Sequence, residues 1–214
     1  YKLDGYGYLP KERTHLWTVE VKNGKTKQLT DHTVYDEYGV SWSPDGKWVA
    51  FVSNRSEDPD FNPDADDVYV MPAVGGEFRK IEAPYGGKGM PVFSPDGKWL
   101  AYYGNAYPGE WYRNNCLWVV PTDGSQPAKN LTEQTDLHID STVINDAGAP
   151  EFTPPTWSKD SQRIYFPVVL NGSSLVMSVG RDGSDLQTLI GEGGTAGSFS
   201  FDSEQQRLAY FYGR

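Results

Sequence analysis

Short apolar stretches separated by turn residues recur along the chain. The stretches Trp48 to Val52 and Trp99 to Tyr103 are apolar at every position, unlike the alternating pattern of a strand with one face in water. Each follows a Ser-Pro-Asp-Gly turn, in which proline presets the second turn position and glycine supplies left-handed backbone. The pattern therefore predicts β-hairpins whose strands are covered on both faces.

The turn and the strand after it form a repeated unit. WSPDGKWVAF at 42–51 returns as FSPDGKWLAY at 93–102, and two divergent copies start at Trp157 and Phe199. The starts are 51, 64 and 42 residues apart, within the range of a propeller blade with loops of variable length. A second type of hairpin lies between the units, with turns at Asn23-Gly24, Gly75-Gly76, Asp123-Gly124 and Asp182-Gly183.

Counting the hairpins predicts an all-β chain of roughly sixteen strands, a β-propeller of about four four-stranded blades. The expected divisions of this single domain or partial propeller, 1–214, are a half blade at 16–30, blades at about 38–82, 90–132 and 155–190, and a half blade at 197–212.

The two predicted terminal halves are complementary. They either join to close a small ring or are the ends of an open arc that meets further blades in a longer protein. We expect the arc, because natural chains seldom leave such strands exposed at both ends. The same open edges would also allow a homo-oligomer.

Composition narrows the function classes. A net charge of -10, from 19 basic against 29 acidic residues, opposes the binding of nucleic acid. No apolar run is long enough for a membrane span, and the first residues do not resemble a signal peptide. We expect a cytoplasmic protein, or a periplasmic or secreted one if a signal peptide has been removed. The single cysteine, Cys116, excludes an internal disulfide and is expected to be a small buried apolar side chain.

The sequence predicts no catalytic residues. A serine peptidase of the α/β-hydrolase type needs a Gly-x-Ser-x-Gly turn between a strand and a helix, and the chain contains no such pentapeptide. His138-Ile139-Asp140-Ser141 brings suggestive residue types together, but neighbours on an extended chain point to alternate sides and cannot form a relay. His15 and His32 are interpreted as turn or edge residues beside the hairpins.

One loop is a candidate for a metal site. Residues 58–67, DPDFNPDADD, carry oxygen side chains at every second position, which calcium favours. Counted from Asp58, however, the sixth position is Pro63 and the twelfth is Tyr69, where the EF-hand pattern needs glycine and glutamate. We therefore interpret the segment as a solvated acidic connection between the second and third strands of a blade, and expect neither metal nor cofactor.

Two sets of strings resemble known families. The SPDGKW units, followed by DDVYVMPAVGGEFRKI, resemble the TolB-type, WD40-like propeller repeat. YKLDGYGYLPKERTHLWTVEVKNGKTKQLTD and FVSNRSEDPDFNPDADDVYVMPAVGGE are similar to the acylaminoacyl-peptidase and dipeptidyl-aminopeptidase branch of the prolyl oligopeptidase family. That resemblance implies an α/β-hydrolase domain carrying Ser, Asp and His elsewhere in the parent protein, with the propeller limiting access to short peptides. Family propellers have about seven or eight blades, so four blades depart from the pattern.

An insertion at 107–115 interrupts one blade with aromatic, acidic and basic residues. Related dipeptidyl peptidases hold the substrate's free amino group with propeller carboxylates, so the resemblance makes Glu110 a candidate for that role and Arg113 a candidate clamp for a carboxylate or carbonyl. The alternative is that Trp111 and Tyr112 only pack the loop. The stretch 133–155 also lacks repeat character and is interpreted as a lid or interface loop.

Two functions remain open from the sequence. The first is a non-catalytic propeller that gates peptide access to the hydrolase domain of a serine peptidase. The second is a stand-alone TolB-like propeller used for protein contacts. A propeller lyase or glycosidase would need histidines or carboxylates along one face, and three histidines disfavour it.

Overall fold

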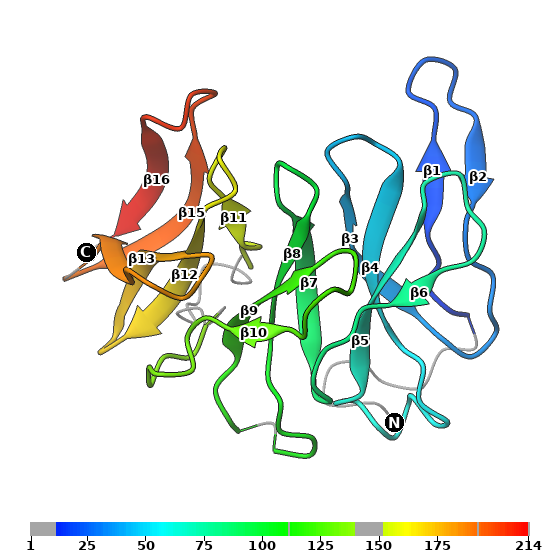
Figure 1. Ribbon diagram of the computed structural model, residues 1–214, viewed down its shortest axis with the longest axis horizontal. Helices are drawn as coiled ribbons and strands as arrows, with labels where there is room; N and C mark the ends of the chain where they lie inside the picture. Colours follow the sequence, from blue (N-terminus) through cyan, green and yellow to red (C-terminus); the bar gives the residue numbers. More distant parts are fainter. Residues whose placement is uncertain (1–11, 111, 140–151, 192, 214) are drawn as a thin grey trace.

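The computed structural model describes residues 12–110, 112–139, 152–191 and 193–213. Within these ranges the chain forms sixteen strands in four sheets and no helix, and hence no helix that could cross a membrane. The sheets stand side by side in chain order (Figure 1). The predicted all-β class is confirmed.

The two middle sheets are complete blades of four strands. Neighbouring strands pair antiparallel and in chain order, so each blade is a meander. The first of these blades consists of β3 (Glu37–Trp42), β4 (Trp48–Asn54), β5 (Asp66–Pro72) and β6 (Arg79–Lys80). The next consists of β7 (Lys88–Phe93), β8 (Trp99–Gly104), β9 (Cys116–Pro121) and β10 (Lys129–Asn130).

The sheets at the ends of the row are built differently. The first contains only β1 (Trp17–Val19) and β2 (Thr26–Gln28). The last contains β11 (Thr156–Trp157), β12 (Arg163–Leu170), β13 (Ser173–Gly180), β14 (Gln187–Ile190), β15 (Thr195–Phe201) and β16 (Leu208–Gly213).

The hairpin of β15 and β16 is joined to the sheet before it, whereas the sequence treats 197–212 as a separate half blade. The strand β14 pairs with β13 only between Val176 and Ser178, which leaves the start of β13 open. There the N–H of Ser174 donates to the carbonyl of Gly194 over 3.1 Å, and Ser174 pairs with Thr195 in a parallel bridge. One short bridge therefore continues the sheet across the expected boundary.

Side chains fix the repeated turns. In the first turn Ser43 Oγ donates to Asp45 Oδ1 over 2.7 Å and accepts from the N–H of Trp48 over 2.9 Å. Gly46 has a φ of 69°, which glycine adopts without strain. The turns that begin at Ser94 and Ser158 have the same serine and aspartate bonds. Local chemistry therefore sets the start of each second strand of a blade.

The core lies between neighbouring sheets. One cluster joins the two middle blades and includes Tyr102, and another joins β8 and β9 to the last sheet and includes Phe166. A third packs Leu16, next to β1, against β4 and β5. The strand β4 is buried at every position after Trp48, because sheets cover both of its faces.

The described chain is an open arc. In Figure 1 the hairpin β1–β2 and the hairpin β15–β16 lie at opposite ends of the row of sheets. No pairing between these two hairpins occurs among the described strands. The ring closure that the sequence permits is therefore not the arrangement of this structure.

Candidate functional site

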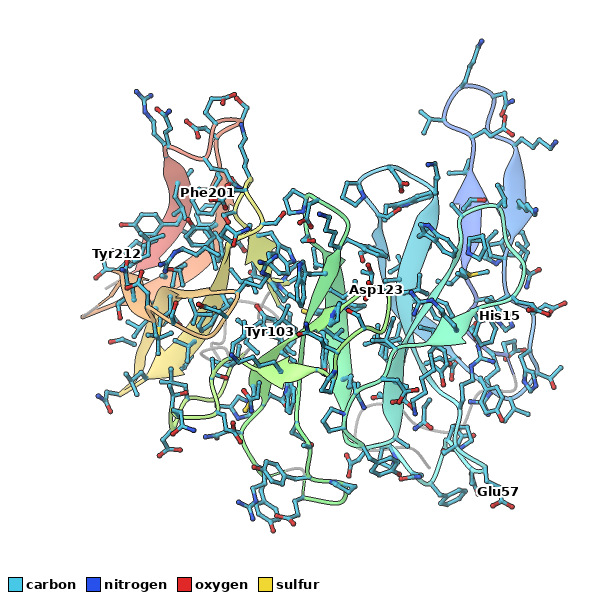
Figure 2. The ribbon with its side chains drawn as sticks, in the orientation of Figure 1. His15, Glu57, Tyr103, Asp123, Phe201 and Tyr212 are labelled. Carbon is cyan, nitrogen blue, oxygen red and sulfur yellow. The ribbon has the colours of Figure 1, made fainter. Side chains whose placement is uncertain are left out.

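Long connections gather at one end of the blades. The β4–β5 connection, 55–65, and the β8–β9 connection, 105–115, both lie there, at the bottom of Figure 1, while the Ser-Pro-Asp-Gly turns lie at the opposite end. We call the first end the loop face. The side chain of Glu57 marks it in Figure 2. The corresponding β12–β13 connection consists of Asn171 and Gly172 alone, so the loops are unequal along the arc.

Glu110 and Arg113 lie together on the β8–β9 loop. Arg113 Nε donates to Glu110 Oε2 over 2.6 Å, and the hydroxyl of Tyr112 donates to the same oxygen over 3.2 Å. The guanidinium of Arg113 also stacks 4.7 Å from the ring centroid of Tyr107. Trp111 lies outside the described residues. The hydrogen bond from Arg113 lowers the pKa of Glu110, and the same bond raises the pKa of Arg113.

This pairing bears on the role that the sequence assigns to Glu110. The carboxylate is ionised and 38% exposed, but Arg113 already balances its charge. A substrate amino group would therefore have to compete with the guanidinium. Substrate binding by Glu110 and Arg113 stays a prediction.

The two long loops are bonded to each other. The N–H of Gly109 donates to Asp64 Oδ2 over 3.1 Å. This bond joins the β8–β9 loop to residues 58–67, which we call the acidic loop. The acidic loop is held in turn by Arg13, whose guanidinium pairs with Asp60 at 2.7 Å and with Asp36 at 3.1 Å. The loop face is thus tied together across two blades.

Two aspartates of the acidic loop form ion pairs with basic side chains. Asp60 contacts Arg13, and Asp67 contacts Lys80 at 2.6 Å and Lys88 at 3.1 Å. In the part of the chain that the structure describes, no three His, Cys, Asp or Glu side chains are grouped so that they could hold a metal. The loop is therefore more structured than the solvated connection that the sequence indicates.

A pocket of about 310 Å³ opens between the loops. The residues that line it include Asp64, Asp66 and Lys88. The Lys88 side chain is only 1% exposed, and its ammonium donates to Asp67 Oδ1 and to the carbonyls of Asp66 and Gly86. Burial lowers the pKa of Lys88. The ammonium is fully engaged in joining two blades.

The pKa of Asp66 is raised above the usual value for an aspartate. Burial raises the pKa of Asp66 to about 6, against the opposing effects of a hydrogen bond from Tyr38 and the positive charge of Lys88. Between about pH 4 and pH 6, therefore, Asp66 keeps its proton in the folded state and has lost it in the unfolded chain. The stability contributed by Asp66 is fully present below about pH 4 and is lost as the pH rises through 6.

Replacing Asp66 by asparagine should remove this pH dependence. We expect Asp66→Asn to raise the free energy of unfolding by about 1–3 kcal/mol at pH 7.5, because burying a neutral amide costs less than burying an ionised carboxylate. At pH 4 the buried aspartate is itself neutral, so the substitution should change the free energy of unfolding little. Urea unfolding at several pH values measures the difference. Asp45→Asn is the matched control: hydrogen bonds lower the pKa of Asp45, so that variant should lose stability most at neutral pH. Equal effects of Asp66→Asn at both pH values would contradict the assignment.

A buried ionic network lies behind the acidic loop, and sequence reasoning missed it. The side chain of Glu37 is 0% exposed. Glu37 Oε2 lies 3.0 Å from His15 Nδ1 and accepts from Thr30 Oγ1 over 2.7 Å, while Oε1 is paired with Arg55. The Arg55 guanidinium also lies 4.7 Å from the ring centroid of Tyr35. His15, labelled in Figure 2, is therefore a network member rather than a simple edge residue.

The sequence does contain a signal for such charges. Glu37 and Lys88 occupy the same position, the first residue of the first strand of a complete blade, and both are buried. A charged residue five positions before the repeated Trp42 or Phe93 marks that position. The partners, however, come from distant parts of the chain.

The remaining candidates take no part in a described site. Ile139 is fully buried and forms a bridge with Val168, whereas Asp140 and Ser141, from the stretch that the sequence indicates cannot form a relay, lie outside the described residues. So does most of the 133–155 stretch. His32 Nδ1 accepts from the N–H of Val34 over 3.1 Å, as a turn residue does. Cys116 is a partly buried free thiol packed against the core cluster between the middle blades.

The fold and its repeated turns define the class of this protein as a β-propeller section. No model of a known protein family matches the chain. Among solved structures, a Mycobacterium tuberculosis puromycin-hydrolyzing peptidase superposes with a TM-score of 0.67 and 16% identity, covering 94% of this chain and 32% of that one. Oligogalacturonate lyase from Vibrio parahaemolyticus gives 0.64, 12%, 92% and 52%, and TolB from Acinetobacter baumannii gives 0.60, 16%, 83% and 38%. These similarities confirm the predicted β-propeller fold.

The sequence relatives narrow the class of protein further than the structural neighbours do. The chain is 34% identical over 189 residues to the uncharacterized peptidase YuxL of Bacillus subtilis strain 168, and 24% identical over 200 residues to dipeptidyl-peptidase 5 of Arthroderma otae. The alignments cover 86% and 84% of this chain but only 28% and 26% of the relatives, so the chain spans about a quarter of their length. The predicted resemblance to the propeller region of prolyl-oligopeptidase-family peptidases is confirmed.

Proposed function

We propose that this chain is the non-catalytic propeller region of a serine peptidase, and that it gates peptide access to a separate α/β-hydrolase domain. The similarity to peptidases supports the class of the parent protein. The observation that carries the gating role is the loop face, where two long loops from neighbouring blades are bonded through Gly109 and Asp64. The sequence contains no Gly-x-Ser-x-Gly pentapeptide, and the proposal assigns the nucleophile to the hydrolase domain.

Gating requires loops that keep their shape when a peptide approaches. The ion pair of Glu110 with Arg113 and the stacking of Arg113 on Tyr107 hold the β8–β9 loop from within. Its bond to Asp64 holds it from outside. A loop fixed in this way restricts passage by its size, and does not need to close on the peptide.

The first experiment identifies the parent protein. The residues that follow Arg214 in the coding sequence should include a hydrolase domain of roughly two hundred residues with Gly-x-Ser-x-Gly, and the whole protein should hydrolyse peptide esters or amides. A stop codon there, with no hydrolase partner encoded, would instead favour a TolB-like protein-contact role.

The second experiment tests gating in that whole protein. Residues 105–115 are replaced by Asn-Gly, the connection that the chain itself uses between β12 and β13. We expect kcat/KM for long peptides to rise roughly tenfold while the value for a dipeptide substrate stays within about twofold, since only large substrates meet the loop. An unchanged ratio of the two values would remove the gating role.

Glu110 provides a separate prediction about specificity. In the whole protein Glu110→Gln should raise KM for peptides with a free amino end by about five- to tenfold, because a charge-assisted hydrogen bond is lost, and should leave N-acylated peptides unaffected. Glu57→Gln is the control, because Glu57 is an exposed acid on the same face. Equal KM values for wild type and Glu110→Gln would show that Glu110 serves only to hold Arg113.

A further inference from the structure

A groove of about 580 Å³ opens between the two complete blades. It lies at the end of the blades that carries the Ser-Pro-Asp-Gly turns, opposite the loop face. Pro44 and Asp45 of the first turn line it, and so do Pro95 and Asp96 of the second. Asp123, which also lines it, lies between the two middle sheets in Figure 2. All the lining residues belong to these two blades, so the groove does not depend on the sheets at the ends of the row.

A tryptophan in this groove lacks the cover that its equivalent has. Trp48 ends the SPDGKW unit of the first complete blade, and Trp99 ends the same unit of the second. Trp48 lines the groove and is 42% exposed. Trp99, in contrast, is half-buried and packs against the core cluster that includes Phe166. The difference comes from the sheet that follows each blade.

An arginine of the last sheet covers Trp99. The guanidinium carbon of Arg181 lies 4.5 Å from the centroid of the Trp99 ring. Arg181 also interacts electrostatically with Asp96, in the turn before that tryptophan. An aromatic face with a carboxylate beside it is a favourable site for a guanidinium. At this interface the protein therefore fills the site with its own arginine.

Backbone hydrogen bonds identify the residue that is placed to cover Trp48. The N–H groups of Thr122 and Arg181 donate, over 2.9 Å and 2.8 Å, to the carbonyl of the residue just before the second strand of their own sheet. Both donors directly follow the third strand of that sheet. The two residues are therefore equivalent, and Thr122 has the position from which Arg181 covers Trp99. The hydroxyl of Thr122 donates instead to the carbonyl of Gly97 over 3.0 Å, and the tryptophan of the groove stays exposed.

The charge of the groove favours a cation. Its lining residues include three carboxylates, of Asp45, Asp96 and Asp123, against one guanidinium, of Arg79. Arg79 already donates to a backbone carbonyl of the second complete blade. Lys47 pairs with Asp45 at 3.4 Å, but the two side chains are 76% and 50% exposed, so water screens that pair. Negative charge therefore remains beside the exposed indole ring.

We propose that this groove binds an arginine side chain of a partner protein, whose guanidinium stacks on Trp48 as Arg181 stacks on Trp99. The methylene stem of such an arginine packs along the apolar lining, to which Pro44 and Pro95 contribute. Arginine fits better than lysine, because a planar guanidinium can stack on a ring and donate to a carboxylate at the same time. The groove lies at the opposite end from the loop face, so this site is separate from the proposed gate.

A capped peptide tests the site in the 214-residue chain. In Ac-Gly-Arg-Gly-NH2 only the arginine side chain is charged, and an NMR titration of the backbone amides should show saturable binding with a Kd of roughly 1 mM. The lysine peptide should bind about fivefold more weakly, and the alanine peptide should not bind. Equal affinities for the arginine and alanine peptides, or no saturable binding, would overturn the proposal.

Two tryptophan variants locate the bound peptide. Trp48→Leu should weaken binding of the arginine peptide by about tenfold or more, because the aromatic face is lost. Trp17→Leu is the matched control: Trp17 is 58% exposed but does not line the groove, so the affinity should stay within about twofold. Circular dichroism first establishes that both variants are folded. Equal affinities of the two variants would show that the peptide does not stack on Trp48.

An exchange between the two equivalent positions tests the same site from within. Thr122→Arg gives the groove the arginine that the next interface already has, so it should abolish binding of the arginine peptide. Arg181→Thr removes the cover of Trp99 and should add a second peptide site beside that ring. Undiminished binding by Thr122→Arg, or no additional site in Arg181→Thr, would contradict the equivalence on which the proposal rests.

Discussion

Glu37→Gln should lower the free energy of unfolding by about 3–5 kcal/mol. The substitution keeps the shape of the side chain but removes the negative charge that is paired with Arg55. The Glu37 side chain is completely buried, so water cannot replace that charge. The guanidinium is left without its counter-charge, and the hydrogen bonds from His15 and Thr30 lose an ionised acceptor. Urea unfolding followed by tryptophan fluorescence measures the loss.

Glu57→Gln is the matched control for this experiment. It makes the same chemical change at an exposed position and should alter the free energy of unfolding by less than about 0.5 kcal/mol. The double variant Glu37→Met with Arg55→Met should be more stable than Glu37→Gln, since it leaves no unpaired buried charge. If Glu37→Gln unfolds at the same urea concentration as Glu57→Gln, the network does not stabilise the fold.

Phe166→Ala is the second substitution with a large expected effect. The ring is 0% exposed in the cluster between β8–β9 and the last sheet, where it packs among side chains such as Ile164 and Leu117. Removing it leaves a cavity that the flanking sheets cannot close, so the free energy of unfolding should fall by about 3–5 kcal/mol. Urea unfolding by circular dichroism and by fluorescence measures the loss and shows whether the blades separate together.

The control for the core is Phe61→Ala. Phe61 lies in the acidic loop and is 77% exposed, so its removal should change stability by less than about 0.5 kcal/mol. Similar losses for Phe61→Ala and Phe166→Ala would mean that the stacking of blade on blade contributes little. The fold would then depend on the turns and on backbone pairing.

The fold follows from the sequence because its determinants are local and repeated. Proline, aspartate and glycine within four residues define each Ser-Pro-Asp-Gly turn, and the apolar run after it defines a strand that needs cover on both faces. The hydrogen bonds that join Ser43 to Asp45 and to Trp48 recur at the turn that begins at Ser94. Each repeat therefore predicts the next.

The candidate site is less predictable, because its contacts join residues far apart in the chain. The pairing of Gly109 with Asp64 and of Arg13 with Asp60 depends on how neighbouring blades stack. Glu110 and Arg113 are visible in the sequence as an unusual loop, but their mutual ion pair depends on the conformation of that loop.

The sequence by itself determined that this protein is an all-β propeller section similar to peptidase propellers, since turns and apolar runs act over a few residues. Only the tertiary structure decided that Glu37 is buried with Arg55, that Lys88 joins two blades, and that β15 continues the last sheet. Only the tertiary structure shows, too, that Trp17 and Tyr210 are exposed, and that the strands that carry them, β1 and β16, lie at opposite ends of the row of sheets. The physical reason is that burial and charge pairing depend on which sheets meet, and no short stretch of sequence encodes that.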